Sequence, residues 1–255
     1  MGISEGHSRA LYPGKKPTLA LFGGAFNPVH CGHITLASEI EARLGLSEIL
    51  FIPTGHPPHK EIPDVSCDER RHMVDLAISG HPGWRSTDIE CRLEGPSYSA
   101  RTIEHLGIEP PPFFVMGEDA FVDFWDWGRP EEILSRTHLV IVNRPGAIRK
   151  GVEEALLTVL RAAQASVCSR SVRETLRESE QTRGREHVWG LPLFGSTIRF
   201  LKIDALPVSS TDLRKLLAGE RTAECSDLLP EGVKSYIVKR GYYQGSPKGG
   251  DRVAL

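Results

Sequence analysis

Two histidines, His30 and His33, follow a glycine-rich turn that starts at Gly23 and Gly24. Residues three apart on a helix share one face, so the two rings could donate hydrogen bonds to one anion. Paired glycines let a ligand approach the backbone, and the unpaired amides and dipole of a helix N-terminus favour a phosphate. The turn therefore predicts a phosphate site. The alternatives are that the histidines cap or pack against the helix, or that they form half of a metal site, for which no third ligand stands at a characteristic spacing.

A second phosphate-facing segment follows the last apolar run, at residues 208–214. Ser210 or Thr211 is expected to be the N-cap of a helix there. Arg214 stands about one turn further on, so hydroxyls, free amides and a guanidinium could converge on one polyanion. Taken alone, the segment is equally well explained as a capped helix. Together with the glycine-rich turn it predicts a polyphosphate site.

A sheet must position these two turns. Short apolar runs alternate with amphipathic stretches, which is typical of strands buried on both faces and connected by helices. Strands are predicted at residues 18–22, 48–53, 84–90, 113–117, 138–143 and 197–203. Helices are predicted from about His30 to Leu44 with Gly45 as the stop, from Ser66 with Glu69 completing a capping box, and over residues 152–163. The pattern indicates an α/β fold with a mostly parallel sheet.

The length of 255 residues suits one large domain, with 40% hydrophobic and 25% charged residues. We expect a flexible segment at 1–16, a single domain at 17–243 with a mobile excursion at about 169–186, and a flexible tail at 244–255. The formal net charge of -2 argues against a binder of nucleic acid polymers.

The apolar runs, the first residues and the cysteines indicate the cellular compartment and the redox state of the thiols. The longest apolar runs are far shorter than the roughly 20 residues that a membrane span needs, and the first residues do not resemble a signal peptide. We therefore expect a cytoplasmic protein with no membrane association. The five cysteines have no pair at CxxC spacing and are expected to be reduced thiols: Cys31, Cys67, Cys91, Cys168 and Cys225.

Four blocks of the sequence resemble one family of enzymes. They are the turn ending in His30-Cys31-Gly32-His33, then Pro57-Pro58-His59-Lys60, then Gly117-Glu118-Asp119 followed by Trp127, and finally Ser209-Ser210-Thr211 with Arg214. The first and last resemble the nucleotidyltransferase superfamily marked by (His/Thr)-x-Gly-His. The middle two resemble its nicotinate-nucleotide adenylyltransferases. The resemblance covers roughly residues 19–243 and is weakest at 149–195.

This resemblance implies a Rossmann-like sheet with helices on both faces and a small C-terminal helical part. It implies that the catalytic residues are His30, His33 and Arg214. The residues implied to bind ATP are Gly23, Gly24, Phe26, His30, His33, Asp119, Ser209, Ser210, Thr211 and Arg214. Those implied to bind the pyridine nucleotide are Asn27, Lys60, Tyr98, Ser99 and Trp127, although Trp127 is alternatively a core aromatic. Arg101 departs from the family, which usually has an acidic residue there.

The implied reaction transfers the adenylyl group of ATP to nicotinate mononucleotide, giving deamido-NAD and pyrophosphate, with Mg²⁺ accompanying ATP. A phosphate monoester has a second pKa of about 6, so the nucleophile is already ionised and needs no general base. Three alternatives remain: nicotinamide mononucleotide as acceptor, a sibling enzyme such as phosphopantetheine adenylyltransferase, and a non-catalytic nucleotide sensor. Whether the protein is a homo-oligomer stays open.

Overall fold

The computed structural model describes residues 18–57, 65–143, 150–165, 172, 186–203, 208–219 and 227–244. Most of the segments predicted to be flexible, and with them Cys168 and Cys225, lie outside these residues. Among the helices of the described part, none is both long and apolar enough to cross a membrane.

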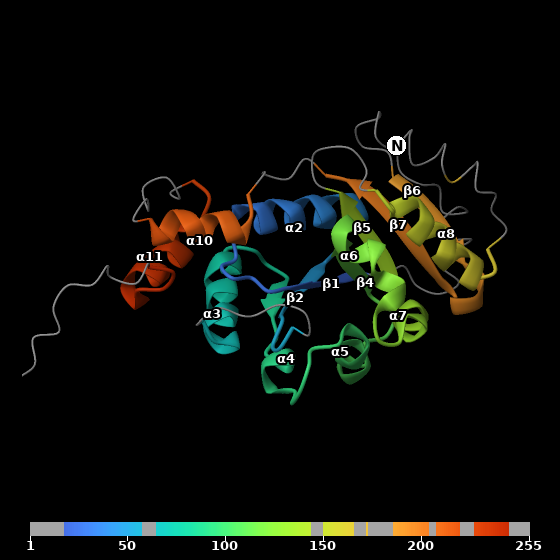
Figure 1. Ribbon diagram of the computed structural model, residues 1–255, viewed down its shortest axis with the longest axis horizontal. Coiled ribbons are helices and arrows are strands. Elements are labelled where there is room, and N and C mark those ends of the chain that lie inside the picture. The colour runs from blue at the N-terminus through green and yellow to red at the C-terminus, as the bar shows by residue number, and fades with distance from the viewer. Residues whose placement is uncertain are drawn as a thin grey trace, which may run out of the picture.

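Seven strands of the described part form one sheet with the order β3-β2-β1-β4-β5-β7-β6 (Figure 1). They are β1 (Leu19–Gly24), β2 (Glu48–Pro53), β3 (Trp84–Ser86), β4 (Phe113–Gly117), β5 (His138–Asn143), β6 (Glu186–Leu191) and β7 (Ser196–Lys202). All neighbours pair in parallel except β6, which is antiparallel to β7. The chain order reverses between β1 and β4, and in such sheets ligands bind at the carboxyl ends of the strands beside this reversal.

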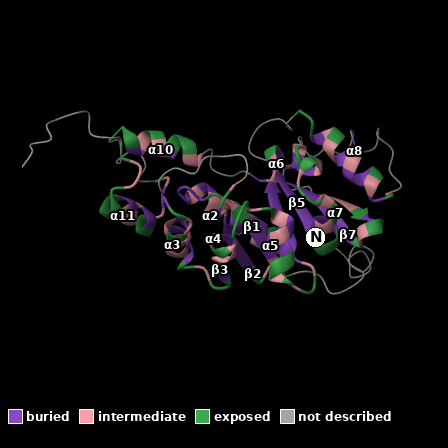
Figure 2. Cartoon of the chain, turned by 60° about the horizontal axis from the view of Figure 1, so that its bottom comes forward, coloured by how far each residue is buried: buried purple, intermediate pink, exposed green. Residues whose placement is uncertain are grey.

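Helices cover both faces of the sheet, as predicted (Figures 1 and 2). Side chains of β2 alternate between the faces, with Ile49 and Phe51 in one core and Leu50 and Ile52 in the other. The first core is covered by α2 (Cys31–Leu44), α3 (Cys67–Ile78), α10 (Ser210–Ala218) and α11 (Glu231–Arg240). The second is covered by α5 (Ser99–Leu106), α6 (Glu118–Val122), α7 (Pro130–Arg136) and α8 (Val152–Ala162). The helices α10 and α11 form the small C-terminal helical part.

The predicted strands at 48–53, 113–117 and 138–143 are confirmed, and those at 18–22 and 197–203 correspond to β1 and β7 with ends shifted by one or two residues. One strand prediction is wrong in its extent, and one strand was missed. The strand expected at 84–90 ends at Ser86, and a short helix, α4 (Ile89–Arg92), follows because the Thr87 hydroxyl accepts a hydrogen bond from the Ile89 amide. The strand β6 was not predicted. It lies at the sheet edge and is bound only to β7, so its sequence lacks the continuous apolar run of a central strand.

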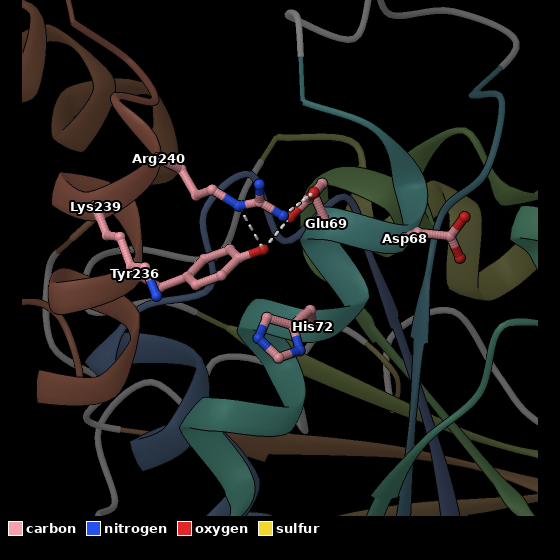
Figure 3. A pocket seen from close by; sticks show the side chains of 6 residues that line it. All are labelled: Asp68, Glu69, His72, Tyr236, Lys239 and Arg240. Atoms are coloured by element: carbon pink, nitrogen blue, oxygen red, sulfur yellow. Dashed lines mark hydrogen bonds and ion pairs between the residues drawn. The ribbon is translucent and has the colours of Figure 1, made fainter.

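The helix ends agree with the sequence in part. Gly45 closes α2 in the left-handed conformation, with φ of 61°. The Ser66 side chain accepts a hydrogen bond from the Glu69 amide at 3.2 Å and so caps α3. The second half of the predicted capping box is wrong, because the Glu69 carboxylate is held by α11: it accepts hydrogen bonds from Tyr236 and Arg240 (Figure 3). The hydrogen bond from Tyr236 and the charge of Arg240 lower the pKa of Glu69.

These contacts line an open cleft of about 540 Å³ between α3 and α11 (Figure 3). None of the predicted site residues lines this cleft. Within the cleft, Glu69 of α3 binds Tyr236 and Arg240 of α11, and these contacts join the C-terminal helix to the sheet domain.

Two of the five cysteines form a disulfide, so the expectation of five reduced thiols is wrong for this pair. Cys67 at the start of α3 and Cys91 in α4 are bonded, with their Cα atoms 5.4 Å apart. They stand 24 residues apart in the sequence, and only the packing of α3 and α4 beside β2 and β3 brings them together. Cys31 is a free thiol.

A buried histidine lies at the amino end of β5, the edge opposite the carboxyl ends of the strands. The Nδ1 atom of His138 is 3.1 Å from the Thr197 hydroxyl, and Arg199 is buried further along β7. Burial, and secondly the positive charge of Arg199, lower the pKa of His138 to about 4. This histidine is therefore neutral at pH 7 and belongs to the core.

Candidate active site

The glycine-rich turn begins where β1 ends, beside the reversal of strand order. A Cβ atom at Gly23 would meet no atom within 4 Å, so the backbone here borders open space. Phe26 has a positive φ of 45°, and its buried ring packs edge-on against Phe22 and near Phe51. The ring therefore anchors the turn in the core. Any contact of Phe26 with ATP must come from its main chain.

The two histidines are stacked at the N-terminus of α2. Their ring centroids are 3.7 Å apart, and the backbone amide of His30, the N-cap residue, donates to Nδ1 of His33 at 3.2 Å. An Nδ1 atom that accepts a hydrogen bond carries no proton, so the neutral ring of His33 carries its proton on Nε2. His33 therefore presents a hydrogen-bond donor. No group of three or more His, Cys, Asp or Glu in the described residues could hold a metal ion, which leaves the metal alternative without a third ligand.

The second phosphate-facing segment docks directly on the first. The hydroxyl of Ser210 donates to the carbonyl of Pro28 at 2.9 Å, and Nη1 of Arg214 donates to the carbonyl of Asn27 at 2.7 Å. These pairs are 182 and 187 residues apart in the sequence. A Cβ atom at Gly32 would lie only 2.7 Å from Cγ1 of Val208, so the backbone at Gly32 is also in close contact with the Val208 side chain. The structure thus brings the two histidines alongside the start of α10.

The cap of α10 differs from the sequence expectation. Ser209, rather than Ser210 or Thr211, is the N-cap, and its side chain accepts from the Asp212 amide at 3.1 Å. The Ser210 hydroxyl is consequently available for the glycine-rich turn. The Thr211 hydroxyl accepts from Nη2 of Arg214 at 3.2 Å. The guanidinium is therefore held between α10 and the turn.

The C-terminal residues clamp the same turn, a contact that sequence reasoning missed. The hydroxyl of Tyr243 donates to Oδ1 of Asn27, which is buried, and the Cys31 amide donates to the Leu228 carbonyl at 2.9 Å. Burial raises the pKa of Tyr243 above its ordinary value, so the phenol keeps its proton. The hydrogen bond from Tyr243 to its side-chain oxygen ties Asn27 to the C-terminal residues, and its role in binding the pyridine nucleotide stays a prediction. No local pattern in the sequence indicates this contact, because Asn27 and Tyr243 are 216 residues apart.

Asp119 lies at the carboxyl end of β4, the strand on the other side of the reversal from β2. Its side chain is exposed and folds back over Gly117, where an added Cβ atom would lie 2.4 Å from Oδ1. β4 pairs with β1, so Asp119 and the glycine-rich turn follow neighbouring strands at the same edge.

The predicted pyridine residues are placed in part. Tyr98 is 46% exposed and precedes α5, and its ring would lie 3.7 Å from a Cβ atom at Gly128, the residue after Trp127. Trp127 is partly buried and its ring centroid is 5.7 Å from that of Phe124, so the core reading of this residue is partly correct. Ser99 is half-buried at the first position of α5. Lys60 lies outside the described residues.

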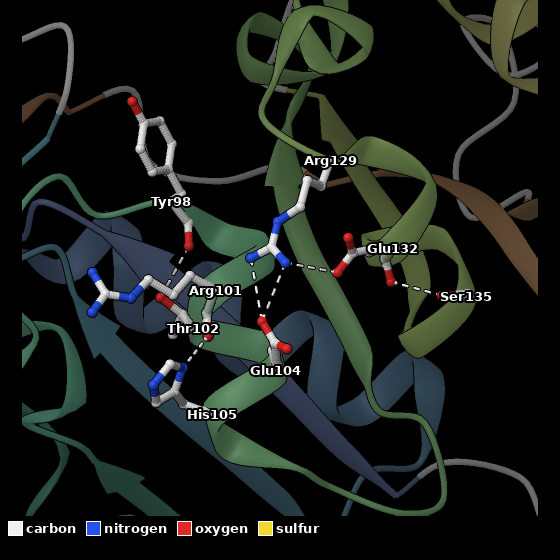
Figure 4. A network of polar contacts seen from close by, with 8 residues as sticks. All are labelled: Tyr98, Arg101, Thr102, Glu104, His105, Arg129, Glu132 and Ser135. Carbon is white, nitrogen blue, oxygen red and sulfur yellow. Dashed lines mark hydrogen bonds and ion pairs between the residues drawn. The ribbon is translucent and has the colours of Figure 1, made fainter.

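Ion pairs hold α5 against α7 (Figure 4). Arg129 contacts Glu104 of α5 at 3.2 Å and Glu132 of α7 at 3.0 Å. Arg101, the departure from the family pattern, donates to the Glu94 carbonyl at 2.5 Å. In Figure 4 Tyr98 points away from this network, which leaves its ring accessible.

Comparisons with known proteins agree with this geometry. The family model described as cytidylyltransferase-like matches residues 21–216. The nicotinate-nucleotide adenylyltransferases of Salmonella typhimurium and Salmonella typhi are 32% identical over 233 residues, covering 90% of this chain and 100% of theirs. The chain belongs to the cytidylyltransferase-like family, in its nicotinate-nucleotide adenylyltransferase branch.

The fold of this adenylyltransferase family member also matches solved structures. The Plasmodium falciparum nicotinic acid mononucleotide adenylyltransferase complexed with NaAD aligns with a TM-score of 0.59 at 17% identity, covering 89% of this chain and 97% of that one. This similarity extends over nearly the whole of both chains, so the Rossmann-like prediction is confirmed for the fold as a whole.

Proposed function

We propose that this protein transfers the adenylyl group of ATP to nicotinate mononucleotide, forming nicotinate adenine dinucleotide and releasing pyrophosphate. The observation that carries the proposal is the docking of α10 on the glycine-rich turn through Ser210 and Arg214. Two helix N-termini with their donors lie beside one another there, which suits a chain of phosphates far better than a single anion. The named activity of the 32% identical relatives supports the same reaction.

The chemistry requires alignment and positive charge rather than a base. An oxygen of the mononucleotide phosphate attacks the α-phosphorus of ATP, and the bond from that phosphorus to the pyrophosphate oxygen breaks. The attacking phosphate has a second pKa of about 6 and arrives ionised. Negative charge grows on the α-phosphate and on the departing pyrophosphate. We assign His30 and His33 to the former and Ser210, Thr211 and Arg214 to the latter.

Magnesium enters with the substrate. No group of three or more His, Cys, Asp or Glu among the described residues could hold a metal ion, and the phosphate oxygens of ATP and water are ligands that Mg²⁺ prefers. Bound to them, Mg²⁺ would neutralise phosphate charge. We assign the phosphate contact of Ser210 to its main-chain amide, because its hydroxyl donates to the Pro28 carbonyl.

The acceptor site in this proposal lies between the start of α5 and the segment around Trp127. Tyr98 and Trp127 offer aromatic faces, and the first-turn position of Ser99 offers a hydroxyl and amides. An electron-poor pyridine ring that carries a carboxylate suits such a site. We place the enzyme in the cytoplasm, without a nucleic acid polymer as partner.

Pyrophosphate release from MgATP tests this function directly. Nicotinate mononucleotide should be turned over faster than nicotinamide mononucleotide, and phosphopantetheine should not react. Turnover with phosphopantetheine alone would identify the sibling enzyme instead. Binding of ATP with no turnover for any acceptor would identify a nucleotide sensor.

A further inference from the structure

Arg70 is a fully buried arginine whose guanidinium binds three main-chain carbonyls. It lies on α3 and is 0% exposed. Nη1 donates to the carbonyl of Ala25 and Nη2 to that of Thr54, both at 2.6 Å, and Nε donates to that of Val65 at 3.4 Å. Ala25 is in the glycine-rich turn, Thr54 directly follows β2, and Val65 precedes the Ser66 cap of α3. One rigid, planar group thus links the glycine-rich turn to the end of β2 and to the start of α3.

Glu90 on α4 holds Gly55, the residue that follows Thr54. Its buried carboxylate accepts from the Gly55 amide at 3.3 Å and from the Thr102 hydroxyl at 2.7 Å. Gly55 is pressed against α4, since a Cβ atom there would lie 2.0 Å from the Glu90 carbonyl oxygen. Thr102 is in α5, which starts directly after Tyr98. Glu90 therefore links Gly55 to the proposed acceptor helix, α5.

The two buried charges depend on each other. Burial lowers the pKa of Arg70 and raises that of Glu90, and the charge of each opposes the shift of the other. Buried charges are costly unless they are compensated and hydrogen-bonded. The buried charges of Arg70 and Glu90 therefore add little to the free energy of unfolding, and their main effect is to fix the geometry of the groups that they bind. The Cys67–Cys91 disulfide joins the two helices that carry them, α3 and α4.

We propose that Arg70 and Glu90 are positioning residues for adenylyl transfer, a role that rests on the function proposed above. In-line attack requires the reacting atoms of two separately bound substrates to meet at roughly 3–3.5 Å. Arg70 sets the separation between the glycine-rich turn and Thr54 at the end of β2. Glu90 sets the position of the next residue, Gly55, relative to α5. Neither side chain contacts the reacting atoms.

The first test is Arg70→Lys. Lysine keeps the positive charge, but its compact ammonium replaces the planar guanidinium that binds three carbonyls at once. At saturating ATP and nicotinate mononucleotide, kcat should fall on the order of 100-fold. The protein should still unfold cooperatively and bind a non-hydrolysable ATP analogue. Arg71→Lys is the matched control on the same helix, because the half-buried Arg71 contacts Asp75 one turn further along α3. A kcat for Arg70→Lys within twofold of wild type would overturn the role of Arg70.

The second test is Glu90→Gln, which also decides the matter if Arg70→Lys does not fold. Gln keeps one acceptor oxygen but loses the charge and the second acceptor. The KM for nicotinate mononucleotide should rise about tenfold while the KM for ATP changes less than twofold. Asp88→Asn is the control, since Asp88 is the half-buried N-cap residue of α4 and pairs with the exposed Arg92. Equal changes in both KM values, or none, would overturn the proposal.

The wild-type protein separates this inference from the proposed function. If the wild type shows no turnover with the two substrates, the proposed function fails and the inference fails with it. If the wild type is active and each variant matches its control, the inference alone is refuted.

Discussion

Replacing Gly32 with Ala would test whether the two phosphate-facing segments must touch. Gly32 is in the first turn of α2, where a Cβ atom would lie 2.7 Å from Cγ1 of Val208 and 3.0 Å from Nδ1 of His30. Ordinary contact begins at 3.4 Å, so Val208 must move by about 0.7 Å. A β-branched side chain has little freedom to rotate away, so the backbone leading to Ser209 must move with it.

The magnitudes follow from this displacement. Helix propensity alone would make alanine more stable than glycine here by about 1 kcal/mol. Overpacking costs about 1–3 kcal/mol, so the free energy of unfolding should fall by about 0–2 kcal/mol despite the better helix former. The larger effect is on turnover, because a catalytic constellation tolerates about 0.5 Å and loses up to about 100-fold at 1 Å. We expect kcat to fall about 10- to 100-fold.

The assay is pyrophosphate release at saturating substrates, with urea unfolding in parallel. Gly80→Ala is the matched control, because no atom lies within 4 Å of a Cβ atom built there. The double variant Gly32→Ala/Val208→Ala removes the tightest contact and should regain most of the lost turnover. Wild-type turnover in Gly32→Ala, or a double variant no more active than the single one, would refute the idea that this contact sets the geometry.

His33→Ala should lower kcat on the order of 100-fold, and added imidazole should not restore activity, because the attacking phosphate needs no base; rescue by imidazole would contradict this. The neutral, buried His138 has a pKa of about 4, against 6.5 in the unfolded chain. As the pH falls from 6.5 to 4, only the unfolded chain takes up a proton at this residue. Up to about 3 kcal/mol of the free energy of unfolding is therefore lost over this range. His138→Gln should reduce this loss in urea unfolding between pH 7 and pH 5, and an unchanged slope would count against the assignment. Reducing the Cys67–Cys91 bond, whose cysteines are 24 residues apart, should cost about 3 kcal/mol of unfolding free energy, and an unchanged denaturation midpoint would argue against the bond. Tyr243→Phe leaves the buried Asn27 oxygen without its donor and should cost about 1–3 kcal/mol in thermal unfolding, whereas an unchanged Tm would show that water or another group replaces it.

Local patterns predicted the central elements because the information is local. The strands β2, β4 and β5 are continuous apolar runs, and Gly45 and Ser66 mark a helix end and a helix start with their own backbone and side-chain chemistry. The edge strand β6 has no such run, and α4 depends on a hydrogen bond from the Ile89 amide to the Thr87 hydroxyl two residues earlier. Both were missed because their stability comes from one neighbour rather than from the pattern of their own side chains.

The candidate site was likewise predictable from the sequence only in part. The chemistry of His30, His33, Ser210 and Arg214 is visible in the sequence, because a helix N-terminus after a glycine-rich turn attracts anions wherever it lies. The contacts between these residues and the glycine-rich turn cannot be predicted from the sequence.

The amino-acid sequence by itself determined the parallel α/β architecture and the kinds of donor that face a polyphosphate. Only the tertiary structure decided that α10 rests on the turn after β1, that Tyr243 binds the side chain of Asn27, and that Arg70 and Glu90 hold the adjacent residues Thr54 and Gly55. Contacts between residues far apart in the chain depend on how the sheet orders its strands. Periodicity and spacing report only on neighbours along the chain, so they carry no record of that order.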